Sequence, residues 1–210
     1  MELKVEENLE LLLDQIADAL VGKGYIVLDS ALPESLVYNL ISHLDQLEVN
    51  GLKAAGIGRG RDLQQKLQIR GDTIQWLSNL EAVESEFLDW MDRLRVGLNQ
   101  RLYAGLADYE GHFAVYPVGA FYQKHLDTFR DQPFSDKPTR KISSVLYLNS
   151  DWKEEDGGEL LLYDESGDEI VETIAPECGK LVVFLSEKFP HGVNAAKKRR
   201  RSIPGWFRSR

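Results

Sequence analysis

The sequence predicts an α+β fold, in which three N-terminal helices support a β-rich half built as a sandwich or a jelly roll. Two observations predict it. Apolar residues recur at helical spacing through much of the first 104 residues, and from about residue 112 short β-rich runs alternate with turn residues. An immunoglobulin-like sandwich fits less well, because it would not need the long helices.

The first half of the chain predicts three helices and one short strand. A stripe of leucine, isoleucine and alanine side chains between residues 9 and 20 marks the first helix, which Gly22 and Gly24 end. Tyr25–Leu28 is an apolar run of strand length. A second helix begins after Leu32, with Pro33 in its first turn, and a third runs roughly from residue 79 to residue 104.

The second half predicts short strands bounded by turns such as Asp156-Gly157-Gly158. These strands are residues 113–116, 121–126, 141–148, 159–163, 180–185, 192–195 and 202–207. One residue departs from the pattern. Pro204 removes a backbone N–H donor from a strand that should be internal, which predicts a ladder position without a partner, or a bulge.

The composition is that of a globular protein, with 43% hydrophobic and 28% charged residues. No stretch reaches the ~18 apolar residues of a membrane span. The acidic start of the chain also lacks the basic region of a signal peptide. The single cysteine, Cys178, cannot pair within the chain, which fits a reducing compartment. We therefore expect a cytoplasmic protein that does not enter a membrane.

The net charge of −9 is unevenly spread. Residues 197–210 hold seven Lys or Arg and no acid, which leaves a balance of −16 on the first 196 residues. Binding of nucleic acid by the whole surface is not expected, because phosphate binding needs a basic face. The run Lys197–Arg201 could be a nucleic-acid patch or a targeting signal, but a solvated turn into the last strand is the favoured interpretation.

Two of the four histidines suggest a metal centre. Side chains two residues apart on a strand point to the same face, so His125 and Asp127 can reach one metal ion. His191, which follows another predicted strand, would complete two histidines and one carboxylate, the facial triad used for non-haem iron(II). The pair alone is a weak signal, because a strand-end histidine bonded to a nearby aspartate gives the same pattern.

Two further residues favour the metal centre. Arg200 lies nine residues after His191, at the head of the last strand, and Tyr147 ends the run that begins at Lys141. A buried arginine and a tyrosine hydroxyl can bind the far carboxylate of a dicarboxylic co-substrate whose near end chelates the metal. Arg199 and Arg201 are alternatives to Arg200.

Four segments carry a family pattern in their order, residue types and spacing. They are Tyr116-Pro117 with Gly119, Tyr122, His125 and Asp127; Arg140 with Tyr147-Leu148-Asn149, Trp152, Gly157-Gly158 and Leu160; Pro190-His191 with Arg200 and Trp206; and Ile69-Arg70-Gly71-Asp72 with Ile74 and Trp76. Over most of residues 55–207 the chain thus resembles the 2-oxoglutarate- and iron(II)-dependent oxygenases of the prolyl 4-hydroxylase type. Within that type it is similar to the oxygen-sensing prolyl hydroxylases and their bacterial relatives. The resemblance implies a double-stranded β-helix (jelly-roll) core with N-terminal support helices.

The resemblance also implies roles for single residues. The metal ligands would be His125, Asp127 and His191, and no further catalytic residue is expected. The C5 carboxylate of 2-oxoglutarate would be held by Arg200 and Tyr147, in a pocket also lined by Tyr116, Tyr122 and Trp206. A substrate loop would include Arg70, Asp72 and Arg140, the last two at positions that can form an ion pair at its base.

We expect one catalytic domain over residues 1–210. Residues 1–110 would be mostly helical support with a mobile loop, and residues 111–210 would be the jelly-roll core. The loop is residues 54–68, where Gly56, Gly58 and Gly60 leave the backbone with little to fix it. It would close over the metal when substrate binds; a plain linker is the alternative.

The implied activity is hydroxylation of prolyl residues in a protein substrate, coupled to decarboxylation of 2-oxoglutarate to succinate and CO2. The implied cofactors and co-substrates are iron(II), 2-oxoglutarate and O2, with ascorbate as a further candidate ligand. A translation protein such as elongation factor Tu is a specific guess for the substrate. The alternatives are an oxygenase acting on a free amino acid or a nucleic-acid base, and a jelly roll that binds metal and senses without turnover.

Overall fold

The structure is a computed structural model of the 210-residue chain, and it describes residues 2–50, 52–54, 71–128 and 138–209. Its elements are three helices, α1 (Glu2–Gly22), α2 (Glu34–Asn50) and α4 (Ala82–Leu102), a short 3-10 helix η1 (Glu154–Asp156), and the strands β1 (Tyr25–Leu28), β2 (Lys53–Ala54), β3 (Thr73–Trp76), β4 (Leu106–Tyr116), β5 (Tyr122–His125), β6 (Thr139–Tyr147), β7 (Leu160–Tyr163), β8 (Ile170–Ile174), β9 (Leu181–Leu185), β10 (His191–Val193) and β11 (Arg200–Ser209).

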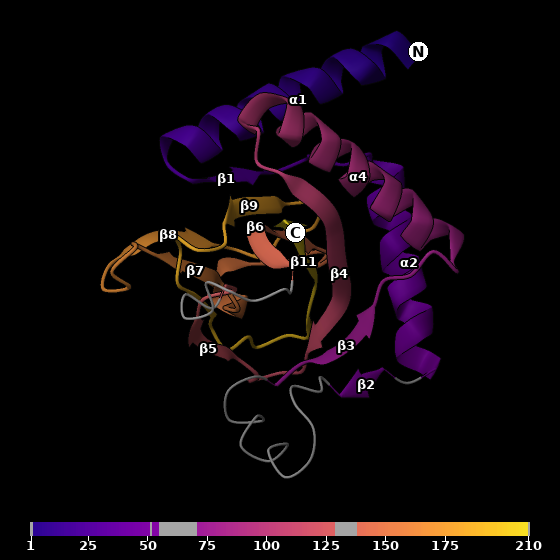
Figure 1. The fold of residues 1–210 in the computed structure, drawn as a ribbon. Coiled ribbons are helices and arrows are strands. Elements are labelled where there is room, and N and C mark those ends of the chain that lie inside the picture. Colours follow the sequence, from indigo (N-terminus) through magenta and orange to yellow (C-terminus); the bar gives the residue numbers. More distant parts are fainter. Residues whose placement is uncertain (1, 51, 55–70, 129–137, 210) are drawn as a thin grey trace.

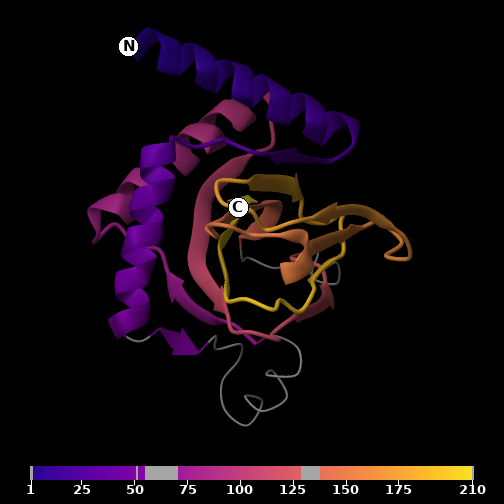
Figure 2. The same cartoon turned by 180° about the vertical axis from the view of Figure 1, so that it is seen from behind.

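The strands form two antiparallel sheets that enclose the site. The major sheet has the order β1-β9-β6-β11-β4-β3-β2, and the minor sheet has the order β5-β10-β7-β8. The helices lie against the outside of the major sheet, with α4 along β4 and α1 across β1 and β9 (Figure 1). The view from behind shows the same arrangement, with α2 beside α4 (Figure 2). The predicted fold, a jelly-roll core with N-terminal support helices, is confirmed.

Local sequence explains where the helices begin and end. In α1 the buried positions Leu13, Ile16, Ala17 and Leu20 recur every three or four residues and form one stripe. The helix closes because the amide of Gly24 donates to the carbonyl of Ala19 (2.9 Å), with Gly24 at φ +87° in a conformation that favours glycine. The carbonyl of Pro33 accepts from the amides of Leu36 and Val37 at the start of α2.

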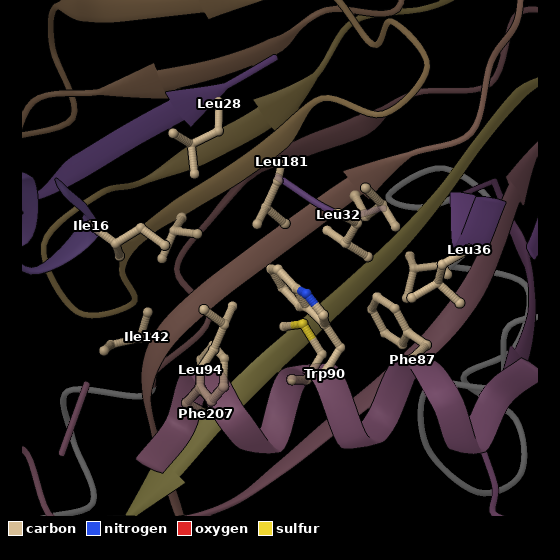
Figure 3. Close-up of a cluster of buried hydrophobic side chains, with 14 of the residues drawn as sticks. Ile16, Leu28, Leu32, Leu36, Phe87, Trp90, Leu94, Ile142, Leu181 and Phe207 are labelled. Carbon is tan, nitrogen blue, oxygen red and sulfur yellow. The ribbon is translucent and has the colours of Figure 1, made fainter. Parts of the chain in front are cut away.

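The main hydrophobic core lies between the helices and the outer face of the major sheet. Figure 3 shows side chains of α4, among them Phe87, Trp90 and Leu94, pointing toward Leu181 of β9 and Leu28 of β1. Ile203 and Phe207 of β11 belong to this core, whereas Arg200, Ser202 and Trp206 fall on the opposite face of the same strand. The major sheet therefore has an apolar outer face. Its inner face carries Arg200 and Ser202 beside apolar residues such as Val182 and Phe184, which pack against the minor sheet, and forms one wall of the site.

The strands differ from the sequence prediction at β4 and at β2, β3 and β8, which were not predicted, whereas Pro204 behaves as predicted. β4 begins at Leu106 rather than Phe113, because its first half carries charged residues that cross-strand ion pairs stabilise. β8 was not predicted, since this strand at the edge of the minor sheet is mostly exposed and shows little apolar alternation. Pro204 pairs with Val145 of β6, while the pairing of β11 with β4 passes from Ser202 directly to Gly205. The ladder is therefore interrupted on the β4 side at Pro204, as its missing N–H predicts.

Within the described part of the chain, no helix has the length and apolar character needed to cross a membrane. The predicted mobile loop, residues 54–68, and the predicted substrate residue Arg70 fall outside the described residues, apart from Ala54.

Candidate active site

The three residues predicted as metal ligands come together. His125 ends β5, Asp127 follows it by two residues, and His191 begins β10. The two strands are antiparallel, with His191 directly opposite His125. The candidate ligand atoms of the three residues all lie within 4.8 Å of one another. The strand register therefore places two histidines and one carboxylate around a single point.

Hydrogen bonds set the orientation of both imidazoles. The Nδ1 atom of His125 lies 2.8 Å from the carbonyl of Gln123, and that of His191 lies 3.0 Å from the carbonyl of Phe189. A carbonyl only accepts, so each Nδ1 carries the proton and each Nε2 keeps its lone pair when the ring is neutral. The Nε2 atoms of His125 and His191 face the Asp127 carboxylate at 3.7 Å and 3.5 Å. Three electron-pair donors thus converge, which is the donor set that a divalent cation needs.

The carboxylate of Asp127 is ionised despite its burial. Burial raises the pKa of Asp127, but His191, His125 and the Ser143 hydroxyl outweigh that effect, and its pKa is lowered. Ser143 on β6 donates to Asp127 Oδ2 over 2.7 Å, and its own hydroxyl lies 2.8 Å from that of Ser186. The Ser143–Asp127 hydrogen bond joins β6 of the major sheet to the segment that follows β5 of the minor sheet.

One aromatic ring packs against each of the two histidines. Tyr122 stacks on His125 with 3.8 Å between ring centroids, and Phe184 meets His191 edge-on at 4.9 Å. Tyr122 therefore borders the metal centre, next to the pocket that the sequence assigned to it.

A buried cation lies on the facing sheet. Arg200 of β11 is 2% exposed, and its Nε donates to the carbonyl of Gly158 over 2.9 Å. Its guanidinium carbon lies 5.1 Å from the ring centre of Tyr147 and 5.3 Å from that of Tyr116. Among the described residues Arg200 makes no ion pair, and the buried Tyr147 hydroxyl has no hydrogen-bond partner. A buried cation beside a buried, unsatisfied hydroxyl is a fitting site for a carboxylate.

The Tyr147 hydroxyl remains a donor. Burial raises the pKa of Tyr147, and the nearby Arg200 guanidinium only partly opposes this, so the group stays protonated at neutral pH. Together the residues present fit a dicarboxylate: Arg200 and Tyr147 at one end, and the cation held by the three metal-ligand candidates at the other.

The structure decides between the three consecutive arginines. Arg199 and Arg201 point to the opposite face of β11, where both pair with Glu48 of α2, at 2.9 Å and 2.6 Å. Arg201 also pairs with Asp45 at 2.8 Å. Arg200 is thus the one of the three that faces the site. Because Arg199 and Arg201 are neutralised by α2, this basic run offers little free charge to nucleic acid.

Asn149 and Gly158 hold Arg200 in place, although the sequence suggested no role for them beyond their position in the motif. The Asn149 side chain accepts from the amide of Arg201 (2.6 Å) and donates to its carbonyl (3.0 Å), which fixes the neighbouring residue. Gly158 has φ +75°, and a Cβ there would lie 2.9 Å from the Cβ of Ala196 and 3.3 Å from Cδ of Arg200. Only glycine lets the chain approach Arg200 this closely.

Trp206 and Arg140 lie together on the inner face of the major sheet. Trp206 is 6% exposed, and its indole Nε1 is buried without a hydrogen-bond partner among the described residues. Its nearness to the Asp127 carboxyl makes a small contribution to the lowered pKa of that group. The Arg140 guanidinium lies 3.5 Å from the Trp206 ring centre. Arg140 forms its ion pair with Glu110 (3.0 Å) rather than with Asp72, so the predicted Asp72–Arg140 pair is not the one formed here. The reason is the strand register. Arg140 lies opposite Arg208 of β11, and Glu110 of β4 flanks the same stretch of β11 from its other side, whereas Asp72 is buried just before β3.

These features define an oxygenase site in a jelly-roll fold, and comparison with known proteins identifies the family. The family model for the 2OG-Fe(II) oxygenase superfamily matches residues 111–208, which include all the metal-ligand candidates and Arg200. A solved prolyl-4-hydroxylase from Pseudomonas putida is 40% identical, with a TM-score of 0.82 over 95% of this chain and 100% of that one. The chain belongs to the 2-oxoglutarate- and iron(II)-dependent oxygenases, in their prolyl-hydroxylase group. Membership implies iron(II), 2-oxoglutarate and O2.

Two further relatives are animal proteins. The prolyl hydroxylase EGLN3 of Mus musculus is 29% identical over 94% of this chain and 84% of its own length. A Trichoplax adhaerens prolyl hydroxylase, solved with a peptide from the oxygen degradation domain of hypoxia inducible factor, is 25% identical, with a TM-score of 0.84 over 100% of this chain and 94% of that one.

Proposed function

We propose that this dioxygenase hydroxylates prolyl residues of a protein substrate, with succinate and CO2 as the co-products. The observation that carries the catalytic part is the buried Arg200, which has no acidic partner among the described residues, together with the convergent set of His125, Asp127 and His191. A protein that only bound metal would have no need of a buried cation beside the Tyr147 hydroxyl on the inner face of the major sheet. The support for a prolyl target is the similarity to prolyl hydroxylases along the whole chain.

The residues divide the work between them. His125, Asp127 and His191 would hold iron(II) on one side and leave the opposite side for co-substrate and O2. Arg200 would pair with the C5 carboxylate of 2-oxoglutarate through its planar fork, and Tyr147 would donate a further hydrogen bond. When bound, iron(II) and 2-oxoglutarate supply the oxidising chemistry, in which O2 is consumed, CO2 is released and one oxygen atom enters the substrate.

The protein's remaining contribution is a dry, fixed site. Ser143 keeps Asp127 oriented, and the backbone carbonyls of residues 123 and 189 keep both histidines in the ligating tautomer. Tyr116, Tyr122 and Trp206 would line the pocket and exclude water. We place Asp72 and Arg140, with Arg70, on the side where the substrate enters.

Two alternatives are less well supported. A nucleic-acid base as substrate would call for a free basic surface, whereas Lys198 pairs with Asp156 and Arg199 with Glu48. The apolar side chains of Val118 and Phe121, between β4 and β5, are exposed. A protein substrate could cover them, whereas a free amino acid as substrate would not explain their exposure.

The finer assignments extend this proposal. We place the enzyme in the cytoplasm as a single catalytic domain, with ascorbate as a candidate reductant for the iron. Elongation factor Tu is our candidate substrate.

The deciding experiment is anaerobic reconstitution with iron(II) and 2-oxoglutarate, followed by addition of O2 and host-cell peptides or purified elongation factor Tu. We expect succinate in step with a gain of one oxygen atom on a prolyl residue, located by mass spectrometry. Succinate without any oxygenated prolyl residue would reject the prolyl assignment. The absence of O2-dependent succinate under all conditions would reject the oxygenase mechanism for this chain.

A further inference from the structure

Four charged side chains form an alternating chain beside Trp206, and we call them the Trp206 brace: Asp108, Arg208, Glu110 and Arg140. Arg208 donates to both oxygens of Asp108, over 2.7 Å and 3.0 Å, and to Oε2 of Glu110 over 2.6 Å. Arg140 donates twice to the other oxygen of Glu110, over 3.1 Å and 3.0 Å. Both carboxylate oxygens of Glu110 are therefore occupied, each by a different arginine.

Strand register builds the brace. Across β11 and β4, Trp206 lies opposite Glu110 and Arg208 lies opposite Asp108. On the other side of β11 the register with β6 shifts between residues 207 and 208, so that Arg208 lies opposite Arg140 instead of Lys141. A bulge of this kind re-aims a side chain, and here it turns Arg140 onto the face that carries Ser143 and the site.

The Trp206 brace holds the guanidinium of Arg140 over the aromatic ring of Trp206. The Arg140 guanidinium lies 3.5 Å from the Trp206 ring centre, and Trp206 borders the carboxylate of Asp127. Arg140 and Arg208 are neighbours of like charge. Asp108 pairs with Arg208 alone, so Glu110 is the carboxylate of the brace that neutralises both arginines. Without that carboxylate the two cations would repel, and the Arg140 side chain would leave the indole.

We propose that Glu110, held by Arg208, is a positioning residue that keeps Arg140 stacked on Trp206 and so fixes the wall against which the target residue binds. The statement about the target residue rests on the proposed function. The groups that hold the C5 carboxylate of 2-oxoglutarate are separate from the brace, because Arg200 and Tyr147 lie further along the sheet and none of their described contacts involves it. Trp206 also lines the pocket, but it would not bind that carboxylate.

The test uses the full chain with Glu110→Gln, which keeps the side chain's size and removes its charge. We expect the near-ultraviolet circular dichroism band that Trp206→Phe abolishes to lose at least about half its amplitude, because a released indole is less ordered. In turnover, the KM for a prolyl peptide should rise at least about fivefold, while the KM for 2-oxoglutarate stays within about twofold.

Three further variants separate positioning from general destabilisation. Glu110→Asp keeps the charge and should restore part of the dichroism band and of the peptide KM. Asp92→Asn makes the same charge change in an exposed pair with Arg95 on α4 and should alter neither quantity. Arg208→Lys loses the planar fork toward Glu110, and it repeats the test if Glu110→Gln does not fold.

Two outcomes would overturn the proposal. One is a full Trp206 dichroism band in Glu110→Gln. The other is a proportional rise of both KM values, which marks a merely structural role. If the unmodified enzyme turned over no prolyl peptide, the proposed function would fail, and the dichroism measurement, which needs no substrate, would still decide whether Glu110 orders Trp206.

Discussion

The two sheets supply different parts of the candidate active site, and they hold them in different ways. The minor sheet provides both histidines from short strands of four and three residues, β5 and β10. The major sheet provides Arg200 and Tyr147 from long strands, β11 and β6, of ten and nine residues. Each histidine is oriented by a carbonyl two residues away. By contrast, Gly158, which accepts from Arg200, and Asn149, which fixes its neighbour Arg201, are more than 40 residues distant in sequence.

This difference predicts which substitutions should impair the metal centre and which should impair the binding of 2-oxoglutarate. The metal centre depends on local backbone geometry, so damage to it should come mainly from the ligands themselves. Arg200 and Tyr147, which we call the carboxylate clamp, depend on long-range packing around Arg200. Substitution of residues that never touch the co-substrate should therefore alter the clamp. The predictions below test this division in order of decreasing effect.

The largest effect is expected at the metal centre. His125→Ala or Asp127→Ala removes one of three ligands, and within the described residues no further His, Cys, Asp or Glu joins this group of candidate ligands. Succinate formation at saturating iron(II) should become undetectable while the far-ultraviolet circular dichroism of the fold persists. Asp89→Ala, which changes an exposed carboxylate on α4, is the control and should leave turnover intact. Full activity of either ligand variant would remove the metal assignment.

A smaller and more selective effect is expected at the clamp. Arg200→Lys keeps the charge but loses the planar fork, so the KM for 2-oxoglutarate should rise at least about tenfold. Iron(II) affinity should change much less, because Arg200 lies on the other sheet. Arg201→Lys is the matched control, since its side chain pairs with α2. A rise in this KM with Arg201→Lys but not with Arg200→Lys would show that Arg201, and not Arg200, binds the carboxylate.

The third prediction concerns the support of the clamp. Gly158→Ala puts a Cβ within 2.9 Å of Ala196 and into a backbone with φ +75°, which should cost about 1–3 kcal/mol of stability. Because the carbonyl of Gly158 accepts from Arg200, the KM for 2-oxoglutarate should also rise, by about threefold or more. Gly22→Ala, with no atom within 4 Å of its added Cβ, is the control. If Gly158→Ala lowered the melting temperature and left this KM unchanged, Gly158 would have no part in holding Arg200.

The same division explains what the sequence could predict. The His125–Asp127 pair could be predicted because the two residues are only two positions apart, at the end of β5 and just after it, so their proximity needs no tertiary contact. The helices could be predicted from the sequence because their buried apolar residues recur every three or four positions. Arg200 was harder to single out, since three arginines in a row differ only in which face of β11 each occupies. The family pattern selected Arg200, and the contacts of Arg199 and Arg201 with α2 give the physical reason.

The residues that the sequence missed or misplaced act through long-range contacts. Glu110 carries no local signal, because its importance comes from Arg140 and Arg208 on two other strands. Arg140 pairs with Glu110 instead of the expected Asp72 for a related reason. A one-residue bulge in β6 decides which carboxylate Arg140 meets, and periodicity does not reveal such a bulge.

The smallest effect is expected on the outer face of β11. Arg199 has a side chain that is 59% exposed and pairs with Glu48 over 2.9 Å. Exposed ion pairs contribute about 0–1 kcal/mol, and Glu48 keeps a second partner in Arg201. Arg199→Ala should therefore lower the free energy of unfolding by less than about 1 kcal/mol, measured by urea titration at low salt, and the difference should shrink as salt is added. The KM for 2-oxoglutarate should not change, because the guanidinium of Arg199 points away from the inner face. A tenfold rise in that KM would show that the two faces of β11 are coupled, and the separation between helix-facing and site-facing arginines would then have to be abandoned.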